Sequence, residues 1–484
     1  MTMNPNFEAL GIPTEFSDCF VKQKAAYEAN RNPSYEQRKA DLQAMHRLLV
    51  ENREELIAAV NKDYGVRARF ETILTELLSQ QEGILETIKH LKKWMKPQKR
   101  HLDITQYPLA KARVTPQPVG VVGNVVPWNF PISMAFAPLT GIFAAGNTCM
   151  IKMSENSDNL AQLLIKISPK YFPESKLAFF RDGGGRGPAF TSLPFDHLFF
   201  TGSPMTGKAV MASCAKNLTP VTLELGGKSP AIVAPDYSIT TAAERIMWVK
   251  MLNSGQICTN VDYMMVPEGK ADAFVAEAKR IANARFPDIF NGGEYTSVID
   301  QRQYDRLQAT LEDARAKGAK IIPLFDQKNL NPTEANKRIM PPVIVLNVND
   351  DMDIMQREIF GPLLPIMTYK TREEVVRYVG GHHRPLAFYV YSNDKALVEW
   401  YISNTISGGV TVNDGLLHAG IHSLPFGGSG NSGMGHYHDY EGFCTFSKMR
   451  PVFYQSPIRA INSLMPPYSG WPTKILNFML KMKS

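Results

Sequence analysis

The stretch VGVVGNVVP, residues 119–127, decides the fold. It is an unbroken run of β-branched and small apolar residues, which is typical of a strand buried on both faces of a parallel sheet. The small-residue apolar segment 131–147 predicts a helix that ends in glycine, and TCMIKM, residues 148–153, predicts the next strand. Strands that alternate with helices need crossover connections, so the sequence predicts an α/β protein with a parallel sheet.

The same alternation continues along the chain and then begins again. The expected elements are a helix at 158–168, a strand at 196–203 and a helix at 204–216. A second unit of the same kind begins within PVTLELGGKSPAIV, residues 220–233, and the glycine pair at 226–227 is an expected boundary. Upstream, residues 33–62 carry apolar side chains at three- and four-residue spacing, which predicts amphipathic helix.

Length and composition narrow the class of protein. A chain of 484 residues is too long for one core, so two or three domains are expected. The five cysteines are odd in number and form no CxxC pair, which argues against a disulfide framework and a structural zinc site, and no metal is expected. The N-terminus lacks a signal-peptide pattern and no apolar run reaches the length of a membrane span, so we expect a cytoplasmic protein.

The formal charge of +7 is concentrated at one end of the chain. Residues 442–484 contain no acidic residue, and six lysines and arginines lie among them. The rest of the chain is close to balanced, so a globally basic surface for nucleic acid is not expected.

Cys258, in NSGQICTN, residues 253–260, differs from the other four cysteines. Lone cysteines are mostly small core residues, and that interpretation is kept for Cys19, Cys149, Cys214 and Cys444. The polar neighbours of Cys258 are poor core residues, and a reactive thiol needs a polar, partly open setting that favours the thiolate. From these residues alone, a buried bystander and a nucleophile are equally supported.

Seven short motifs resemble those of one enzyme superfamily and occur in its order. They are PWNFP (127–131), KMSE (152–155), FTGSPMTG (200–207), LELGGKSP (223–230), GQIC (255–258), EIFGPLLPI (358–366) and LPFGGSGNSGMG (424–435). With them, the chain from about residue 30 to about 452 resembles the aldehyde dehydrogenase superfamily. LPFDHLFFTGS (193–203) and GLLHAGIHSLPFGG (415–428) resemble its coniferyl aldehyde dehydrogenase branch, near the class-three aldehyde dehydrogenases.

The resemblance implies an aldehyde dehydrogenase-like fold of two parallel-sheet α/β domains with a small β oligomerisation arm. The expected domains are an NAD(P)-binding domain at 1–96 and 119–222, a catalytic domain at 223–407, an arm at 97–118 and 408–434, and a C-terminal segment at 435–484. A homodimer is expected on the same ground.

The resemblance also implies a division of chemical roles. Cys258 attacks the aldehyde carbonyl, because a thiolate is a strong nucleophile at neutral pH. The side-chain amide of Asn129 and the backbone N–H of Cys258 stabilise the oxyanion, and hydride transfer to the nicotinamide leaves a thioester. Glu224 then activates the water that hydrolyses it, and its apolar neighbours are expected to raise its pKa. Taken singly, Glu224 could be a sheet-edge cap and Asn129 a turn residue.

The cofactor residues are implied by the same motifs. They are Val125, Pro127, Trp128, Lys152, Glu155, Gly183, Gly187, Gly202, Ser203, Glu358 and Phe360. Two residues depart from the family pattern: Asp182 replaces a usual glycine, and Arg186 is an unexpected cation that could accept a 2′-phosphate. Glu155 would instead bind the free 2′-hydroxyl and repel a phosphate, so NAD is expected, with NADP possible.

The C-terminal tail contains WPTKILNFMLKMKS, residues 471–484, in which apolar residues alternate with lysines. Two interpretations stay open: a helix docked on its own protein or on a partner subunit, and a basic amphipathic segment that touches anionic lipid.

Two other functions are weighed against aldehyde oxidation. An acylating dehydrogenase would pass the thioester to coenzyme A, and the presence of Glu224 speaks against it, because that route needs no water-activating base. A catalytically silent structural or membrane-binding protein on the same scaffold is disfavoured by the intact set of Asn129, Glu224 and Cys258. The substrate itself is expected to be an aromatic or an apolar aliphatic aldehyde.

Overall fold

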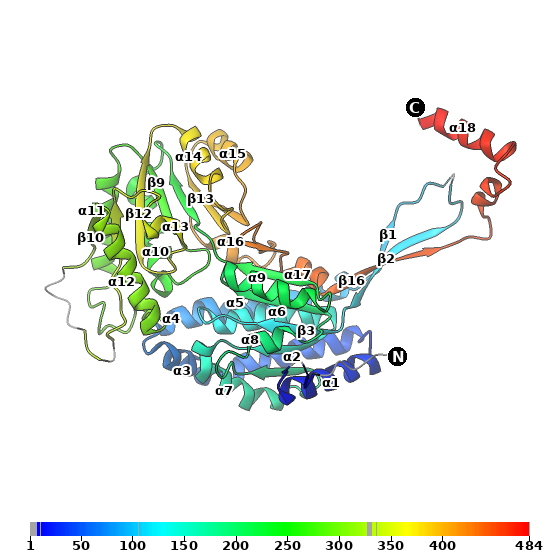
Figure 1. The fold of residues 1–484 in the computed structure, drawn as a ribbon, viewed down its shortest axis with the longest axis horizontal. Coiled ribbons are helices and arrows are strands. Elements are labelled where there is room, and N and C mark those ends of the chain that lie inside the picture. The colour runs from blue at the N-terminus through cyan, green and yellow to red at the C-terminus, as the bar shows by residue number, and fades with distance from the viewer. Residues whose placement is uncertain (1–6, 10, 105, 327–331, 335, 484) are drawn as a thin grey trace.

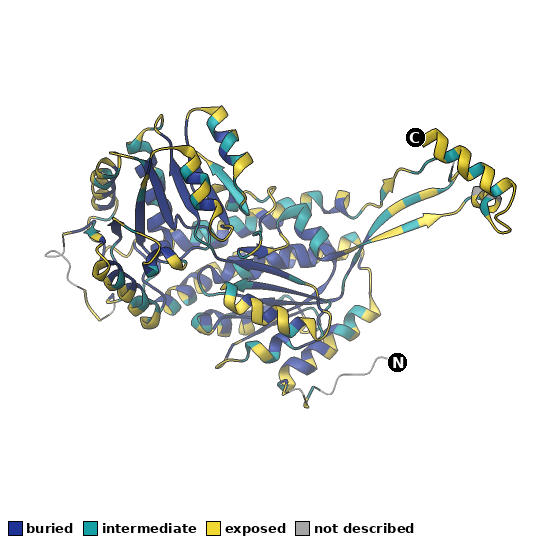
Figure 2. Cartoon of the chain, turned by 45° about the horizontal axis from the view of Figure 1, so that its top comes forward, coloured by how far each residue is buried: buried dark blue, intermediate teal, exposed yellow. Residues whose placement is uncertain are grey.

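Two α/β units lie against each other in the computed structural model, and a long arm extends from them (Figure 1). The structure describes residues 7–9, 11–104, 106–326, 332–334 and 336–483. Each unit is built on one mostly parallel sheet, and the arm is a separate antiparallel sheet of three strands. The buried residues are concentrated in the two larger sheets and the helices against them (Figure 2).

The first unit contains a six-stranded sheet. Its strands, in spatial order, are β15 (Gly433–Met434), β7 (Val221–Leu225), β6 (His197–Gly202), β3 (Val121–Val125), β4 (Thr148–Lys152) and β5 (Leu177–Phe180). All pairs are parallel except β15 with β7. The strand β3, predicted from VGVVGNVVP, lies in the interior of this sheet and all five of its residues are buried.

Helices cover both faces of this sheet because its strands are apolar on both sides. Val122 joins the core formed with α2, α5 and α6, whereas Val121 and Val125 join the opposite core with α1 and α9. The helices are α1 (Thr14–Ala29), α2 (Tyr35–Glu51), α3 (Arg53–Tyr64), α4 (Arg69–Thr72), a π-helical segment (Ile73–Leu78), α5 (Ser79–Trp94), α6 (Pro131–Ala145), α7 (Asp158–Ile167), α8 (Gly187–Thr191), α9 (Pro204–Ala215) and α17 (Asp439–Thr445).

The second unit is built in the same way on a seven-stranded sheet. Its strands, in spatial order, are β10 (Lys320–Pro323), β11 (Val343–Leu346), β12 (Leu363–Tyr369), β9 (Tyr263–Pro267), β8 (Pro230–Val233), β13 (Ala387–Tyr391) and β14 (Gly409–Val412). Only β10 runs antiparallel to its neighbour. Its helices are α10 (Ile239–Met251), α11 (Ala271–Arg285), α12 (Gln301–Ala316), α13 (Asp353–Gln356), α14 (Arg372–Gly380), α15 (Lys395–Asn404) and α16 (Leu417–Gly420).

The arm consists of β1 (Gln98–Arg100), β2 (Lys111–Pro118) and β16 (Ser447–Tyr454), and it ends in the helix α18 (Trp471–Lys483). Every residue of β16 has a Cα partner in β2. Figure 1 shows α18 at the far end of the arm, away from both units, and none of its residues is buried. The interpretation of α18 as a helix docked on its own protein is therefore wrong for the single chain.

Among the described residues, no helix is both long and apolar enough to cross a bilayer.

Three expected boundaries differ from the structure. The strand β7 pairs with β6, so residues 223–225 belong to the first unit and the second begins at the glycine pair 226–227. Residues 409–412 form β14 beside β13, and 433–434 pair with β7, so the segment 408–434 is not part of the arm. The third arm strand comes instead from 447–454, which the sequence places in the C-terminal segment. The sequence of a short edge strand does not show which sheet it joins, because that depends on the neighbouring strand that the tertiary fold supplies.

Gly146 offers a test of the packing beneath the first sheet. It follows α6 in a left-handed conformation, with φ of 93°. A Cβ there would lie 2.8 Å from Nε of the buried Arg38. We therefore expect Gly146→Ala to lower the free energy of unfolding by about 1–3 kcal/mol, measured from the urea midpoint. Gly380→Ala is the matched control, because it lies in a helix with open space around it, and it should change stability by less than about 1 kcal/mol. Equal stability of the two variants would contradict this account.

Candidate active site

The loops of the candidate site leave the sheets at their carboxyl ends. Val125, the last residue of β3, pairs with Lys152 of β4 and with Phe200 of β6, so these three strands end nearly level. The loop after β3 carries Pro127, Trp128 and Asn129. In open α/β sheets this edge is where ligands bind, which makes it the natural position for a cofactor.

Cys258 lies between this edge and the second unit. It is partly buried, in the segment between a 3₁₀ turn (Leu252–Gly255) and β9. The negative charges of Glu358 and Glu224 both raise the pKa of its thiol, so the two carboxyl groups lie within electrostatic reach of it. The structure therefore brings together three sequence-predicted residues that are far apart in the chain.

The surroundings of Cys258 do not favour the thiolate. Burial, and then the charges of Glu358 and Glu224, raise the pKa of the thiol to about 12, and only the backbone N–H groups of Thr259 and Cys258 oppose this. Cys258 is thus partly accessible, but its setting in the chain alone does not favour the thiolate. The neighbouring Asn253, Ser254 and Gln256 are polar, as the sequence suggested, but they are completely buried. The side-chain amides of Asn253 and Gln256 each donate to the other's backbone carbonyl, and the hydroxyl of Ser254 donates to that of Tyr295.

Glu224 has a buried carboxyl group that makes no hydrogen bond to the described residues. It lies on β7, paired with Gly433 of β15, and neither carboxyl oxygen has a hydrogen-bond partner in the described part of the chain. Burial raises its pKa well above the ordinary value for a glutamate. Such an unpaired acid is not the sheet-edge cap that the residue could have been, and burial favours its protonated form more than in an ordinary glutamate.

Glu358 is a second buried acid of the same kind. Burial, with the charge of Asp262, raises its pKa to about 8, while the backbone N–H of Gly227 and the cations Lys228 and Arg306 lower it. Its Oε1 has no partner among the described residues. Gly226 makes room for it, because a Cβ there would lie 1.8 Å from Oε2 of Glu358.

Asn129 is held by its backbone and leaves a side-chain donor free. Its carbonyl oxygen accepts hydrogen bonds from the hydroxyl of Tyr64 (2.8 Å), from Arg67 (3.2 Å) and from the side-chain amide of Asn253 (3.1 Å). Its own Nδ2 donates to the carbonyl of Gln256 at 3.3 Å. An amide nitrogen carries two hydrogens, so one of them is available to a ligand beside Cys258.

Arg67 is the cation that connects these loops, and the sequence analysis missed it. Its side chain has no solvent exposure, and it forms an ion pair with Glu76 at 3.2 Å and a hydrogen bond to the side chain of Asn253. Glu76 in turn accepts the backbone N–H of Ile132 at 2.7 Å, in the first turn of α6. No local pattern around Arg67 indicates this role, since its partners are separated by up to 186 positions in sequence.

The turn before Cys258 is strained, and its surroundings hold it. Asn253, Ser254 and Gly255 have positive φ values of 49°, 53° and 72°. A Cβ on Gly255 would lie 2.4 Å from the carbonyl oxygen of Gly361, so only glycine fits there. The side-chain amide of Gln256 donates to the carbonyls of Asn253 (2.9 Å) and Ser297 (3.0 Å), which fixes the approach to Cys258.

A pocket of about 330 Å³ leads to Cys258. Most of its wall is apolar, and it comes from the π-helical segment, α6, α10 and the segment around α16. These wall residues are Leu74, Leu78, Phe130, Met134, Trp248, Leu252, Ile257, Leu416, Leu417, Phe426 and Tyr437. Polar residues complete the lining, among them Gln80, Glu82, His422 and His438. The sequence does not indicate this lining, because the residues come from separate helices and loops that only the fold brings together.

The predicted cofactor residues lie around the carboxyl edge of the first sheet. The rings of Trp128 and Phe360 pack nearly perpendicular to each other, with centroids 5.3 Å apart, so the two motif loops meet. Gly202 ends β6 and Ser203 caps α9, whose first turn opens beside that strand end. Lys152 ends β4, Glu155 lies exposed in the turn after it, and Gly183 and Gly187 lie in the segment after β5.

The residues at this edge fit a nicotinamide dinucleotide. Thr201 and Glu358 each present a buried polar oxygen with no partner among the described residues, as expected where the hydroxyl groups of a ligand bind. The N-terminus of α9 is a site where backbone N–H groups favour a pyrophosphate.

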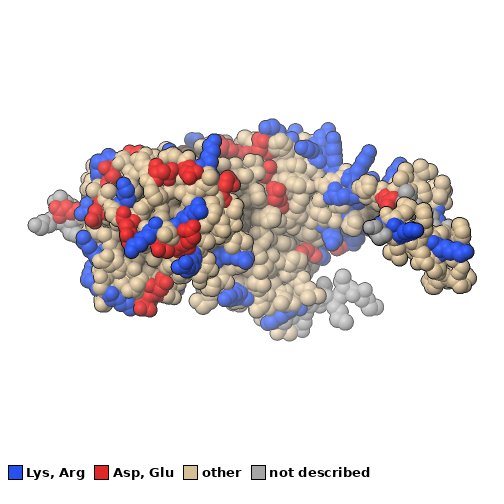
Figure 3. Space-filling view, turned by 90° about the horizontal axis from the view of Figure 1, so that it is seen from above, with Lys and Arg blue, Asp and Glu red and all other residues tan. Residues whose placement is uncertain are grey.

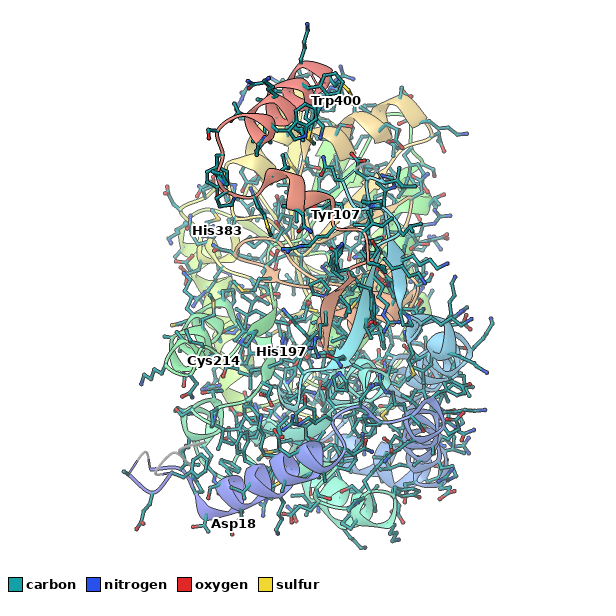
Figure 4. The ribbon with its side chains drawn as sticks, turned by 90° about the vertical axis from the view of Figure 1, so that its right-hand side faces the viewer. Asp18, Tyr107, His197, Cys214, His383 and Trp400 are labelled. Carbon is teal, nitrogen blue, oxygen red and sulfur yellow. The ribbon has the colours of Figure 1, made fainter. Side chains whose placement is uncertain are left out.

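Among the described residues, none of the other cysteines lines the pocket at Cys258. Cys19, Cys149 and Cys214 are buried, and burial raises the pKa of each thiol. Figure 4 shows Cys214 and His197 in the first unit and His383 and Trp400 in the second. Among the described residues, no group of three or more His, Cys, Asp or Glu side chains is arranged to hold a metal ion.

Comparison with known proteins identifies the family. Residues 13–452 match the model of the aldehyde dehydrogenase family. The chain belongs to the aldehyde dehydrogenase family. It is accordingly an oxidoreductase that converts aldehydes to acids with NAD(P), and the fold predicted from the sequence is confirmed.

Individual relatives agree with the branch that the motifs indicate. The chain is 45% identical to a probable coniferyl aldehyde dehydrogenase of Pseudomonas aeruginosa, over 93% of each chain. It is 34% identical to mouse aldehyde dehydrogenase family 3 member B2, over 95% of this chain and 94% of that one. A solved aldehyde dehydrogenase structure, the substrate-bound state of Staphylococcus aureus AldH, matches with a TM-score of 0.88 at 31% identity, covering 96% of this chain and 99% of that chain.

The raised pKa of Cys258 predicts a particular pH dependence of its reactivity. Because only the thiolate is alkylated, we expect the rate of iodoacetamide labelling in the free protein to keep rising from pH 7 to pH 10, without the plateau of a thiol of pKa near 8.5. Labelling of the Cys258 peptide is followed by mass spectrometry. Glu358→Gln removes one negative charge and should increase the rate at pH 9. A plateau below pH 8 in the wild type would contradict the burial account.

Proposed function

We propose that this aldehyde dehydrogenase oxidises aromatic aldehydes of the coniferyl type, and apolar aliphatic aldehydes, to carboxylic acids, with NAD as the preferred cofactor. The observation that supports this most is the apolar pocket of about 330 Å³ that ends at Cys258. Its volume lies within the range of about 300–1,000 Å³ that is typical of small-molecule sites. The polar residues Gln80, Glu82, His422 and His438 suit the hydroxyl and methoxy groups of a substituted aromatic ring.

The geometry around Cys258 supports the following catalytic roles. The sulfur of Cys258 adds to the aldehyde carbon, and its proton passes to one of the neighbouring carboxyl groups. The carbonyl oxygen becomes an oxyanion, which the free hydrogen of Asn129 Nδ2 and the backbone N–H of Cys258 stabilise. The bound NAD supplies the hydride acceptor of the reaction. The product on the enzyme is a thioester of Cys258.

Glu224 is the proposed base for hydrolysis of that thioester. Its carboxylate takes a proton from water, and the hydroxide attacks the thioester carbon and releases the acid and Cys258. Because burial raises its pKa, Glu224 is protonated at low pH and gains its basic form only as pH rises. The hydrolysis rate should therefore rise with pH over a range well above that of an ordinary glutamate.

The preference for NAD is supported by the charges near the adenosine end. Glu155 lies exposed after β4, where its carboxylate can accept a hydrogen bond from a free 2′-hydroxyl. Arg186, which could have received a 2′-phosphate, forms an ion pair with Glu15 of α1 and lies over the ring of Phe16 at 4.7 Å. Its charge is thus already neutralised.

The arm and tail support a homodimer that also touches anionic lipid. The strands β2 and β16 leave several side chains exposed in the single chain, so a second copy can cover them (Figure 2). At the arm and tail end of the molecule, most of the charged side chains visible in Figure 3 are basic. In α18, Trp471, Phe478 and Leu480 are exposed among lysines, as in helices that lie on a membrane surface.

We place the protein in the cytoplasm, since its five cysteines are free.

Single-turnover kinetics tests the proposed chemistry. With Glu224→Gln, we expect one equivalent of NADH per active site in the first turnover, and a steady-state rate lower by about 10²–10⁴-fold, because the thioester forms but is not hydrolysed. Coniferaldehyde, benzaldehyde, hexanal and decanal are the substrates, and NADH absorbance is the measurement.

Cys258→Ala is the control, and it should remove both the burst and the steady state. A Glu224→Gln enzyme that turns over within threefold of wild type would refute the role of Glu224. Absence of NADH formation by the wild type with every aldehyde would refute the proposed function itself.

Removal of residues 457–484 tests the role of the tail. We expect the shortened protein to lose flotation with vesicles that contain phosphatidylserine, because the exposed apolar and basic residues of α18 are gone. It should remain a dimer by light scattering, because β16 and β2 are retained. Equal flotation of the two proteins would exclude the lipid contact, and a monomeric wild type would exclude the dimer.

A further inference from the structure

A buried ion pair lies at the carboxyl edge of the first sheet, beside the expected adenosine site. Lys152 is the last residue of β4, and its Cα partner on β5 is Phe180. Two residues beyond that partner, Asp182 approaches from the neighbouring strand end, and its Oδ2 lies 3.1 Å from Nζ of Lys152. The side chains of Lys152 and Asp182 are only 5% and 10% exposed, so solvent screens their attraction weakly.

The loop after Asp182 holds that carboxyl group in place. Oδ1 of Asp182 accepts the backbone N–H of Arg186 at 2.8 Å, which closes a turn of five residues. The turn needs Gly183, Gly184 and Gly185, whose φ values of 59°, 99° and 89° are all left-handed. Arg186 is directed toward α1, where it pairs with Glu15. The loop thus places the Asp182 carboxylate beside Lys152 and directs Arg186 away from Lys152.

The ion pair changes the charge that a nucleotide meets. Without Asp182, Lys152 and Glu155 would give this edge one positive and one negative charge. With Asp182, Lys152 is neutralised and the edge carries a net negative charge. A 2′-phosphate, with about two negative charges, would have no unpaired lysine there and would be repelled, whereas a neutral 2′-hydroxyl still finds Glu155 as an acceptor.

We propose that Asp182 is a specificity-determining residue, which selects NAD over NADP by holding Lys152 in a buried ion pair. The proposal rests on the proposed preference for NAD and names a residue responsible for it beyond Glu155. The resemblance to the family leads one to expect glycine at position 182. The proposed selection for NAD therefore depends on a residue in which this chain departs from the family pattern.

Binding calorimetry with NAD⁺ and NADP⁺ on the full-length protein, without aldehyde, tests the proposal. We expect Asp182→Asn to bind NADP⁺ about tenfold more tightly than wild type, because one buried negative charge near the phosphate is removed. The affinity for NAD⁺ should change by less than threefold. Asp182→Glu retains the charge and should keep the wild-type ratio of the two affinities.

Arg186→Gln is the matched control from the same loop. Since Arg186 pairs with Glu15, its loss should leave the NADP⁺ affinity within twofold of wild type, and a tenfold loss would make Arg186 the phosphate ligand and overturn the proposal. Thermal unfolding checks each variant, and Asp182→Gly replaces Asp182→Asn if the latter does not fold.

The outcomes separate this inference from the function on which it rests. A wild type that prefers NAD⁺, together with an unchanged ratio of affinities in both Asp182→Asn and Asp182→Gly, overturns only the role of Asp182. A wild type that binds NADP⁺ more tightly than NAD⁺ overturns the role of Asp182 and the proposed NAD preference. A wild type that binds neither nucleotide overturns the proposed function.

Discussion

The geometry of the active site depends on one buried cation, Arg67. It holds the backbone carbonyl of Asn129 and the side chain of Asn253, and Glu76 balances its charge at 3.2 Å. Removing one partner of a buried ion pair typically costs about 3–5 kcal/mol, so these groups have little freedom to separate. The loop after β3 and the turn before Cys258, which belong to different units, are thereby fixed to the same guanidinium group.

The same network explains why a strained turn persists. Each residue held at a positive φ costs on the order of 1–3 kcal/mol, and Asn253 and Ser254 are two in succession. Glu71 accepts the backbone N–H of Asn253 at 3.1 Å, so a second buried acid supports the turn from the helical layer. The N-terminal helical region carries none of the recognisable motifs, but its buried charged residues hold the motif loops in position.

Sequence reasoning reached the repeating parts of this structure and the motif residues, but not the contacts between them. The run 119–127 predicts β3 because burial on both faces demands apolar residues at every position, and the alternation around it predicts the first sheet. The placement of β14 and β16 was wrong, because a short edge strand takes its partner from the tertiary fold. Arg67 and the pKa of Cys258 were beyond prediction for the same reason: both depend on groups that only the fold brings close.

The acidity of the site is best understood as a property of three groups together. Cys258, Glu224 and Glu358 each have a raised pKa, chiefly through burial, and the charges of the two acids raise that of the thiol further. A proton that moves from Cys258 to an ionised Glu358 leaves the net charge of the buried cluster unchanged. The transfer therefore avoids the desolvation penalty that creation of an additional buried charge would carry. In the resting chain, burial first and the two carboxyl groups second keep the proton on sulfur, and in the proposed mechanism the same carboxyl groups are the acceptors that remove it.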